Sequence, residues 1–388
     1  MKKTILMTAI FLFVMVTSSG QGQVFNDELI TVDVTKSYST MKELVLQDFM
    51  DVEYVALETK NDFLNQGFVR DVGKKFIIVT NTNLDGDIFI YNRSGKALRK
   101  INNQGQHLGR EYMSIMGITL DEDNKEMFVN DLLNKSIMVY DLNGKFKRSF
   151  KYKEGTRFQY YKTIYNYDKD NLICFFEEAQ ERREFILISK KDGSVTHEMK
   201  IPIKEHLPFE FHEEKRTDTR GITNMTIVTP HYKSVFPYND NWLITEVSSD
   251  TIYKFLPDYK LRPFIVRTPP IHSMKQRIHL VLHNYTDRYY FMEAIKYEKK
   301  FSGYDFLYDK QEKAFYKYTV YNGDFSTKQE TKFLFKGCNQ EISWRSIDAY
   351  KLVESYNKGE LKDGKLKELA SKLDEEDNAV IMFVKRKK

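Results

Sequence analysis

Two histidines in the stretch "HLVLHNYTDRYY" are the residues whose spacing most directly suggests metal chemistry. His279 and His283 are four positions apart, as in a helical metal-binding pair, but the glutamate pattern of a zinc protease is missing. On a strand, His279, Val281 and His283 would share one face. The sequence therefore offers a divalent-metal pair at His279 and His283, and it favours the alternative of two partly exposed strand histidines.

A second group of side chains has the right chemistry to hold a polar ligand. Aromatic rings stack on sugars or grip peptides, while charged and amide groups form the directional bonds. The candidate ligand-binding residues are Arg110, Glu111, Asn130, Asp131, Tyr161, Tyr232, Tyr289 and Tyr290. The competing interpretations are ordinary strand packing for the tyrosines and capping of a turn for Asp131.

No catalytic motif accompanies these candidates. The sequence contains no Gly-x-Ser-x-Gly, no P-loop and no dinucleotide fingerprint. Its two cysteines, Cys174 and Cys338, match no zinc-binding spacing. We assign no catalytic residue and identify no cofactor beyond a divalent metal.

The N-terminus and the charge pattern indicate where the protein works. Residues 1–20 have two lysines, an apolar run and then small residues, which is typical of a secretory signal peptide. No cysteine lies near the expected cleavage after Gly20, which disfavours a lipoprotein, and no later apolar run is long enough to span a membrane. We expect a monomer in the periplasm or outside the cell. Basic and acidic residues are interspersed, which argues against nucleic-acid binding.

A short sequence pattern recurs three times and indicates how the chain is built. The segments "IFIYNRSG", "IMVYDLNG" and "ILISKKDG" begin at Ile88, Ile137 and Ile186, so the period is about 49 residues. Each segment ends in Ser-Gly, Asn-Gly or Asp-Gly, which are residues suited to a tight hairpin turn. Further short strands precede each copy.

Four short antiparallel strands per repeat are what a β-propeller blade requires, because one blade cannot bury both faces of its sheet alone. Six units take about 294 of the roughly 368 residues that follow the leader, and seven would leave too few for the rest. The sequence therefore predicts an all-β, six-bladed propeller with four-stranded antiparallel blades over residues 21–388.

Three segments depart from the repeat. A polar stretch at about 204–222 is expected to be an insertion between blades. Apolar residues at helical spacing predict a short helical excursion at about 345–377, and we favour a covering role for it over a partner-binding one. The N-terminal "LITVDVT" or "DVEYVALET" should pair with the C-terminal strand and close the ring.

The second unit resembles an NHL repeat. The matching residues are Gly105, Gly109, Glu111-Tyr112, Gly117-Ile118, Asp121, Phe128-Val129, Asp131, Asp141 and Gly144, with Met116 as a departure. The whole chain also resembles a secreted bacterial six-bladed propeller family without an assigned activity. NHL-like enzymes hold metal ligands in the central channel, so this resemblance implies the channel as the place to look for a site.

These features lead to one leading functional hypothesis and two alternatives. The first is an exported, non-catalytic binding propeller that takes a glycan or a peptide at the channel mouth. The second is a metal-dependent hydrolase or lyase with its site in the channel. The third is a structural subunit of a cell-envelope complex, with an envelope protein as its partner. Propellers host many unrelated functions, so the fold alone does not decide among them.

Overall fold

The computed structural model describes residues 28–387, except for 82–84, 106–108, 154–158, 179–181, 208, 210, 218–222, 229, 231, 297–301, 332–334, 336 and 339–341. The expected signal peptide at residues 1–20 therefore lies outside the described residues, as does part of the 204–222 segment. Within the described ranges, no helix is both long and apolar enough to cross a membrane.

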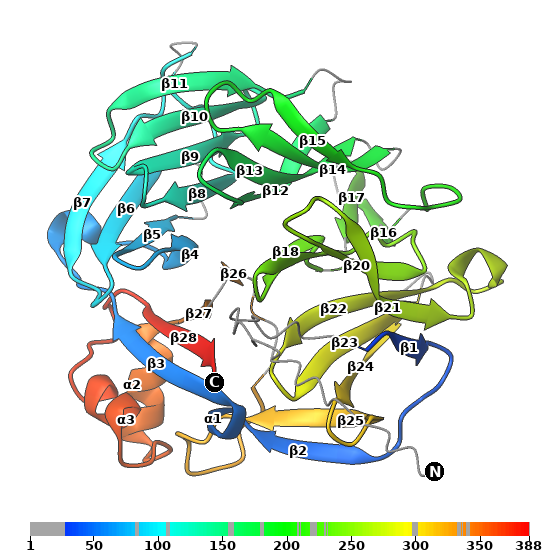
Figure 1. The fold of residues 1–388 in the computed structure, drawn as a ribbon. Coiled ribbons are helices and arrows are strands. Elements are labelled where there is room, and N and C mark those ends of the chain that lie inside the picture. The colour runs from blue at the N-terminus through cyan, green and yellow to red at the C-terminus, as the bar shows by residue number, and fades with distance from the viewer. Residues whose placement is uncertain are drawn as a thin grey trace, which may run out of the picture.

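The described strands form six blades around a ring, as predicted from the repeat (Figure 1). Blade 1 contains β4 (Phe68–Val72), β5 (Phe76–Thr80), β6 (Asp87–Asn92) and β7 (Ala97–Asn102). Blade 2 contains β8 (Gly117–Asp121), β9 (Glu126–Asp131), β10 (Ser136–Asp141) and β11 (Phe146–Lys151). Blade 3 contains β12 (Gln159–Asn166), β13 (Asn171–Glu178), β14 (Arg182–Ser189) and β15 (Val195–Met199).

The other three blades use strands from both ends of the chain. Blade 4 contains β18 (Val235–Tyr238), β19 (Asn241–Ile244), β20 (Thr251–Phe255) and β21 (Leu261–Thr268). Blade 5 contains β22 (Ile278–Tyr285), β23 (Tyr289–Lys296), β24 (Ser302–Asp309) and β25 (Ala314–Tyr321). Blade 6 contains β26 (Gly337–Cys338), β27 (Ile342–Ile347), β28 (Val380–Arg386) and the N-terminal β3 (Met50–Ala56).

The core lies between neighbouring blades, which explains why the middle strands are apolar on both faces. In β5, Ile77 and Val79 pack in the cluster shared with blade 6, while Ile78 between them packs in the cluster shared with blade 2. Six such clusters fill the six interfaces around the ring. Each blade is therefore stable only with a neighbour on each side.

The N-terminal segment runs along the outer edges of three successive blades (Figure 1). Strand β1 (Ile30–Asp33) pairs in parallel with β21 of blade 4, and β2 (Met41–Val45) pairs in parallel with β25 of blade 5. After the short helix α1 (Leu46–Phe49), β3 pairs antiparallel with β28 and completes blade 6. The same segment thus covers two exposed sheet edges and closes the ring.

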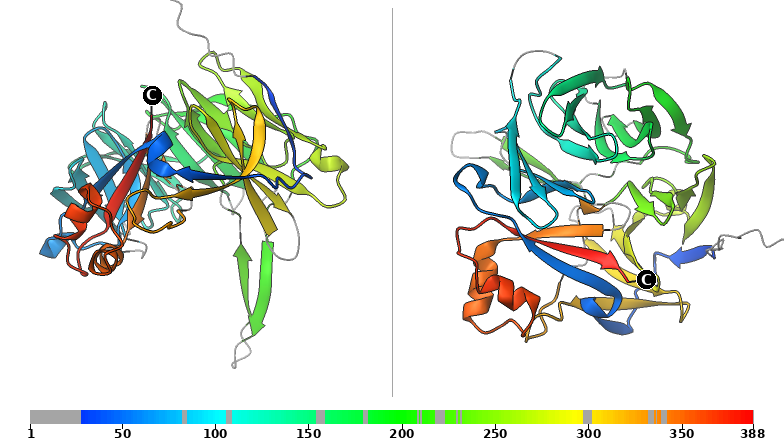
Figure 2. Two further views of the ribbon diagram at one scale, coloured as in Figure 1. Left: turned by 90° about the horizontal axis from the view of Figure 1, so that it is seen from below. Right: turned by 60° about the vertical axis from the view of Figure 1, so that its left-hand side comes forward.

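Two additions lie outside the blades. Helices α2 (Ala349–Asn357) and α3 (Lys365–Ala370) form the predicted helical excursion and bury Leu352, Leu366 and Ala370 against blade 6. The hairpin β16 (Phe211–Thr217) and β17 (Thr223–Val228) connects blades 3 and 4 and projects from the ring (Figure 2, left). Two short 3₁₀ turns, η1 (Asn61–Phe63) and η2 (Ile271–Ser273), complete the described elements.

The repeated turn glycines have a role in joining the blades. Gly95, Gly144 and Gly193 all have positive φ, between 75° and 84°, in the turn between the third and fourth strands. Each also contacts the outer strand of the preceding blade: a Cβ on Gly144 would lie 2.7 Å from the Ile101 side chain. Glycine is required there both by the backbone and by the close approach.

We predict that Gly144→Ala lowers the free energy of unfolding by about 2 kcal/mol, because the alanine must adopt positive φ and displace Ile101. The matched control is Gly359→Ala, where φ is +69° and the added methyl would meet open space. That variant should lose only about 1 kcal/mol. Urea denaturation of both variants measures the difference, and equal losses would show that the contact with Ile101 is unimportant.

Candidate functional site

One face of the ring carries a pocket at the mouth of the central channel. The first strands β4, β8 and β12 end there, and the turns that follow them contribute residues 71–74, 120–124 and 165–169 to its wall. Pro237 and Trp242 of blade 4 face these turns, and the cavity has a volume of about 580 Å³. This size falls within the usual range for small-molecule sites.

Aspartates at the strand ends shape two of these turns. Asp121 Oδ1 accepts a hydrogen bond from the backbone N–H of Asn124 at 3.1 Å. Asp168 Oδ1 accepts from the backbone N–H groups of Asp170 and Asn171 at 2.8 and 2.7 Å. Such side-chain caps let the inner strand reverse within a few residues. They also place several carboxylates at the channel mouth.

Two other carboxylates join blade 1 to blade 2. Asp71 Oδ2 accepts from the backbone N–H of Leu120 at 2.7 Å. Glu122 accepts from three successive N–H groups in the β4–β5 turn, those of residues 74–76, at 2.8 to 2.9 Å. The pocket wall and the blade interface therefore depend on the same acidic groups.

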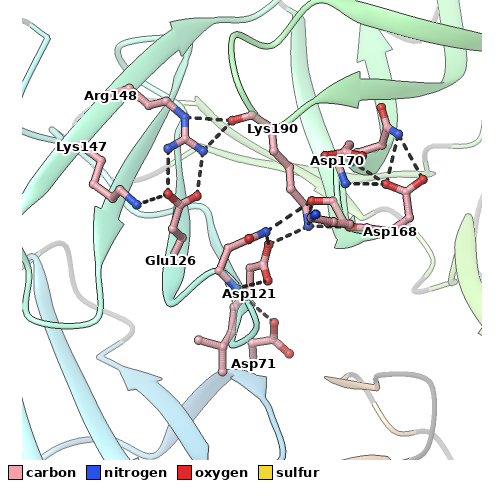
Figure 3. A network of polar contacts seen from close by, with 12 residues as sticks. Asp71, Asp121, Glu126, Lys147, Arg148, Asp168, Asp170 and Lys190 are labelled. Carbon is pink, nitrogen blue, oxygen red and sulfur yellow. Dashed lines mark hydrogen bonds and ion pairs between the residues drawn. The ribbon is translucent and has the colours of Figure 1, made fainter.

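A buried lysine joins blade 2 to blade 3 (Figure 3). Lys190 Nζ donates to Asp121 Oδ2 at 2.6 Å and to the carbonyl oxygen of Asp168 at 2.5 Å. The side chains of Lys190 and Asp121 are only 6% and 1% exposed. Since burying an unpaired charge is costly, this lysine and this aspartate stabilise each other only as a pair.

Arg148 on β11 anchors the backbone of that lysine. Its guanidinium makes a two-pronged bond to the Glu126 carboxylate, at 2.7 and 2.8 Å, and also donates to the carbonyl oxygen of Lys190. A planar, bidentate arginine–carboxylate pair fixes the orientation of the guanidinium as well as its distance from the carboxylate. The network therefore runs from the outer strand of blade 2 to the pocket wall (Figure 3).

Asp71 is the pocket-lining acid with the clearest change in proton affinity. Burial raises the pKa of its carboxyl to about 6. Hydrogen bonds from the backbone N–H groups of Leu120 and Val72 lower this pKa, but by less than burial raises it. The nearby Glu122 adds to the rise. Asp71 can therefore gain or lose a proton close to neutral pH, unlike an exposed aspartate.

The opposite wall of the pocket is aromatic. The rings of Tyr165 and Tyr167 lie 5.6 and 6.0 Å from Trp242, centroid to centroid. Asn166, between the two tyrosines in the sequence, lines the pocket, and Arg93 lines it from the side of blade 1, where its guanidinium lies over the Phe383 ring of blade 6. Asn166 Oδ1 and Arg93 Nη1 are both buried and have no hydrogen-bond partner within the described chain. A ligand would satisfy these two groups if their side chains turned toward the pocket.

The structure places four of the sequence-derived candidates at the other end of blade 2. Asn130 pairs with Gly117 at the start of β8, away from the pocket. Asp131 accepts from the backbone N–H of Met113 at 2.8 Å and from Asn134 Nδ2 at 2.8 Å, as expected of a turn cap. Arg110 and Glu111 precede this strand and do not line the pocket.

The candidate tyrosines lie mostly in the blade interfaces. Tyr161 packs between blades 2 and 3, and the Tyr290 hydroxyl shares a hydrogen bond of 2.7 Å with the Tyr238 hydroxyl between blades 4 and 5. Tyr289 packs against Phe291 and Phe49, where blade 5 meets the segment leading to blade 6. Tyr232 contacts the edge of Phe209. None of these four tyrosines lines the pocket.

The two histidines have different surroundings. A rise of about 3.3 Å per residue separates their positions by about 13 Å along β22. His279 Nδ1 bonds to the carbonyl oxygen of Val247 at 2.9 Å, and burial lowers the pKa of His279 to about 4. His283 Nε2 lies 2.7 Å from Glu293 Oε2, and Asp305 lies close to both. The structure therefore groups His283 with two carboxylates and not with His279.

The pocket residues were not among the sequence-derived candidates, although one pattern could have found some of them. "DEDN" at 121–124 and "DKDN" at 168–171 repeat an Asp-x-Asp-Asn turn in two successive blades. Turns that recur at the same blade position lie side by side at one end of a propeller channel. Asp71 and Trp242 carry no such repeat and could be placed only by the fold.

The fold and this pocket define a six-bladed β-propeller with a polar and aromatic cavity at one channel mouth. Residues 29–385 match the model of a family described as a domain of unknown function, DUF4934, and the chain belongs to that family. This agrees with the expected resemblance to a propeller family of unassigned activity.

One solved structure shares this fold, and a second is only a more distant likeness. A protein from Bacteroides fragilis, described as a candidate exported protein, has a TM-score of 0.54 and 16% identity, covering 93% of this chain and 100% of its own. A member of the DUF4221 family from Bacteroides vulgatus has a TM-score of 0.46 and 14% identity, covering 88% of this chain and 99% of its own. A search of curated proteins gave no match. At 16% identity the likeness to the Bacteroides fragilis protein concerns the fold alone.

We predict that Lys190→Met lowers the free energy of unfolding by about 3 kcal/mol, because Asp121 would remain buried without its cation. Lys191→Met changes the exposed neighbouring lysine and should stay within about 0.5 kcal/mol of the wild type. Urea denaturation compares the two. If both variants behave alike, the Lys190–Asp121 pair does not hold blades 2 and 3 together.

We predict that Asp71 makes the protein less stable as the pH rises. Its folded pKa of about 6 exceeds the ordinary value of 3.8, so the folded state binds more protons between these two values. The unfolding free energy contributed by this group therefore falls from about pH 4 to about pH 6 and then stays constant. Thermal unfolding of the wild type and Asp71→Asn measures it: the variant should gain stability relative to the wild type across this window, and a constant difference would contradict the prediction.

Proposed function

We propose that this protein is an exported, non-catalytic binding propeller that holds a saccharide in the pocket at its channel mouth. The observation that carries the proposal is the presence, in one cavity, of the Tyr165, Tyr167 and Trp242 cluster together with two hydrogen-bonding groups that lack partners among the described residues. Sugars present an apolar ring face and several hydroxyls, so they match such a cavity on both counts.

The charges of the pocket support a neutral ligand over a strongly charged one. Lys190 neutralises Asp121, and the Glu122 carboxylate accepts hydrogen bonds from backbone N–H groups of the neighbouring turn. Lysine and arginine side chains are distributed among the acids of the wall. Once these side chains turn toward the cavity, a hydroxyl-rich ligand can donate to Asn166 Oδ1 and accept from Arg93 Nη1 without burying a new charge. A short peptide is the alternative occupant.

Export is part of the same proposal. The leader-like residues 1–20 support it, and the similar protein from Bacteroides fragilis is described as a candidate exported protein. We propose a location in the periplasm or outside the cell, where soluble glycans and envelope proteins are the available partners.

A metal-dependent hydrolase or lyase is the second candidate, and one observation favours it: the ligand atoms of His283, Glu293 and Asp305 lie close enough together to hold a metal ion. None of these three residues lines the pocket. A reaction at that metal would therefore need a substrate site of its own. Screening of glycosides and lactones, with and without added divalent metal, tests this candidate independently of saccharide binding.

We predict that a glycan array identifies a ligand whose affinity depends on the pocket. In calorimetric titrations with that glycan, Asn166→Ala should weaken binding about fivefold, the effect of losing one hydrogen bond. Asn357→Ala, on the exposed end of helix α2, should bind like the wild type. Unchanged affinity in Asn166→Ala would contradict the proposed site. If the protein binds peptides but no glycan, the ligand is a peptide and the saccharide proposal is wrong.

A further inference from the structure

Blade 5 brings three metal-ligating side chains together outside the pocket. One ligand atom from each of His283, Glu293 and Asp305 lies within 4.8 Å of the ligand atoms of the other two. We propose that these residues form a binding site for a divalent transition metal, with Zn²⁺ as the best fit.

The backbone positions the three ligands on three consecutive strands. In the register of β23 and β24, Glu293 pairs directly with Asp305, so their side chains start about 5 Å apart on one face. In β22, His283 is the extra residue of a bulge between Leu282 and Asn284. A bulge redirects a side chain, and here it brings the imidazole to 2.7 Å from Glu293.

The separations suit a small cation. Zinc binds nitrogen and carboxylate oxygen at roughly 2.0–2.2 Å, so its ligands lie roughly 3–3.5 Å from one another. The His283 to Glu293 distance of 2.7 Å is that of a hydrogen bond, so these two ligand atoms must move slightly apart to admit the ion. The outer limit of 4.8 Å for the whole group requires only small rotations of the carboxylates. Three protein ligands leave a fourth tetrahedral position for solvent or a substrate.

The local charge also favours a cation. Like charges directly opposite each other on paired strands destabilise a sheet, and Glu293 and Asp305 are such a pair. A divalent ion between the carboxylates would replace their repulsion with two attractive contacts.

Burial is graded across the site. The His283 side chain is 3% exposed, that of Glu293 is 13% exposed, and Asp305 is exposed. The histidine is therefore held in place by the blade, while an ion can enter from the side of Asp305. One imidazole and two carboxylates favour Zn²⁺ over Ca²⁺ or Mg²⁺, which prefer oxygen ligands alone.

The test is a calorimetric titration of the chelator-treated full chain with zinc chloride. The wild type should bind one Zn²⁺ per chain, and zinc should raise its melting temperature. His283→Gln and Asp305→Asn should each weaken zinc binding at least tenfold. His197→Gln is the matched control, because His197 stacks on Tyr259 of blade 4 and belongs to no such ligand group among the described residues. Its affinity should equal that of the wild type.

Asp305→Asn keeps the test decisive even if the buried His283 variant misfolds, because Asp305 is exposed and its replacement preserves shape. Absence of zinc binding by the wild type would overturn the proposal, as would full affinity in Asp305→Asn. Calcium chloride binding as tight as zinc binding would overturn the assignment to a transition metal. None of these outcomes depends on a saccharide, so this site and the pocket can fail separately.

Discussion

The pairing of β3 with β28 is the interaction on which the rest of the molecule depends. Each residue from Met50 to Ala56 lies opposite one from Val380 to Arg386, so the two ends of the chain share one blade. Without this pairing, blade 6 would lose its outer strand, and the apolar faces that meet blades 1 and 5 would open. The pocket depends on the same closure, because its wall includes blades 1 to 4 together with Ile342 of blade 6.

The turns at the channel mouth serve both stability and recognition. Asp71, Glu122 and Lys190 each bond to a neighbouring blade, and these bonds leave them little capacity for a ligand. The groups that remain for recognition are the aromatic wall and the atoms of Asn166 and Arg93 that have no partner among the described residues. A ligand would therefore be bound by a wall that the blade contacts already hold rigid, which lowers the entropy cost of binding.

The repeat predicted the blades because packing between blades imposes the same demands on every unit. The three isoleucines at a period of 49 all lie in blade interfaces, and the three glycines all contact the preceding blade. The pocket was not predicted, because Asp121 and Asp168 look like ordinary turn caps in the sequence. Only the closed ring brings them near Trp242, which follows more than seventy residues later. The grouping of His283 with Glu293 and Asp305 likewise required the strand register and the bulge, which no local pattern encodes.

The most direct test of the pocket as a binding site uses Trp242 as a reporter. The sequence has two tryptophans, of which Trp242 lies in the pocket wall. In the variant Trp344→Phe, Trp242 would be the only tryptophan left to report on the pocket. Titration of this variant with a glycan selected on an array should change the tryptophan emission in a saturable way, with the same dissociation constant as calorimetry gives. Glycan binding by calorimetry without any change in the emission of Trp242 would show that the ligand lies elsewhere and would contradict this account.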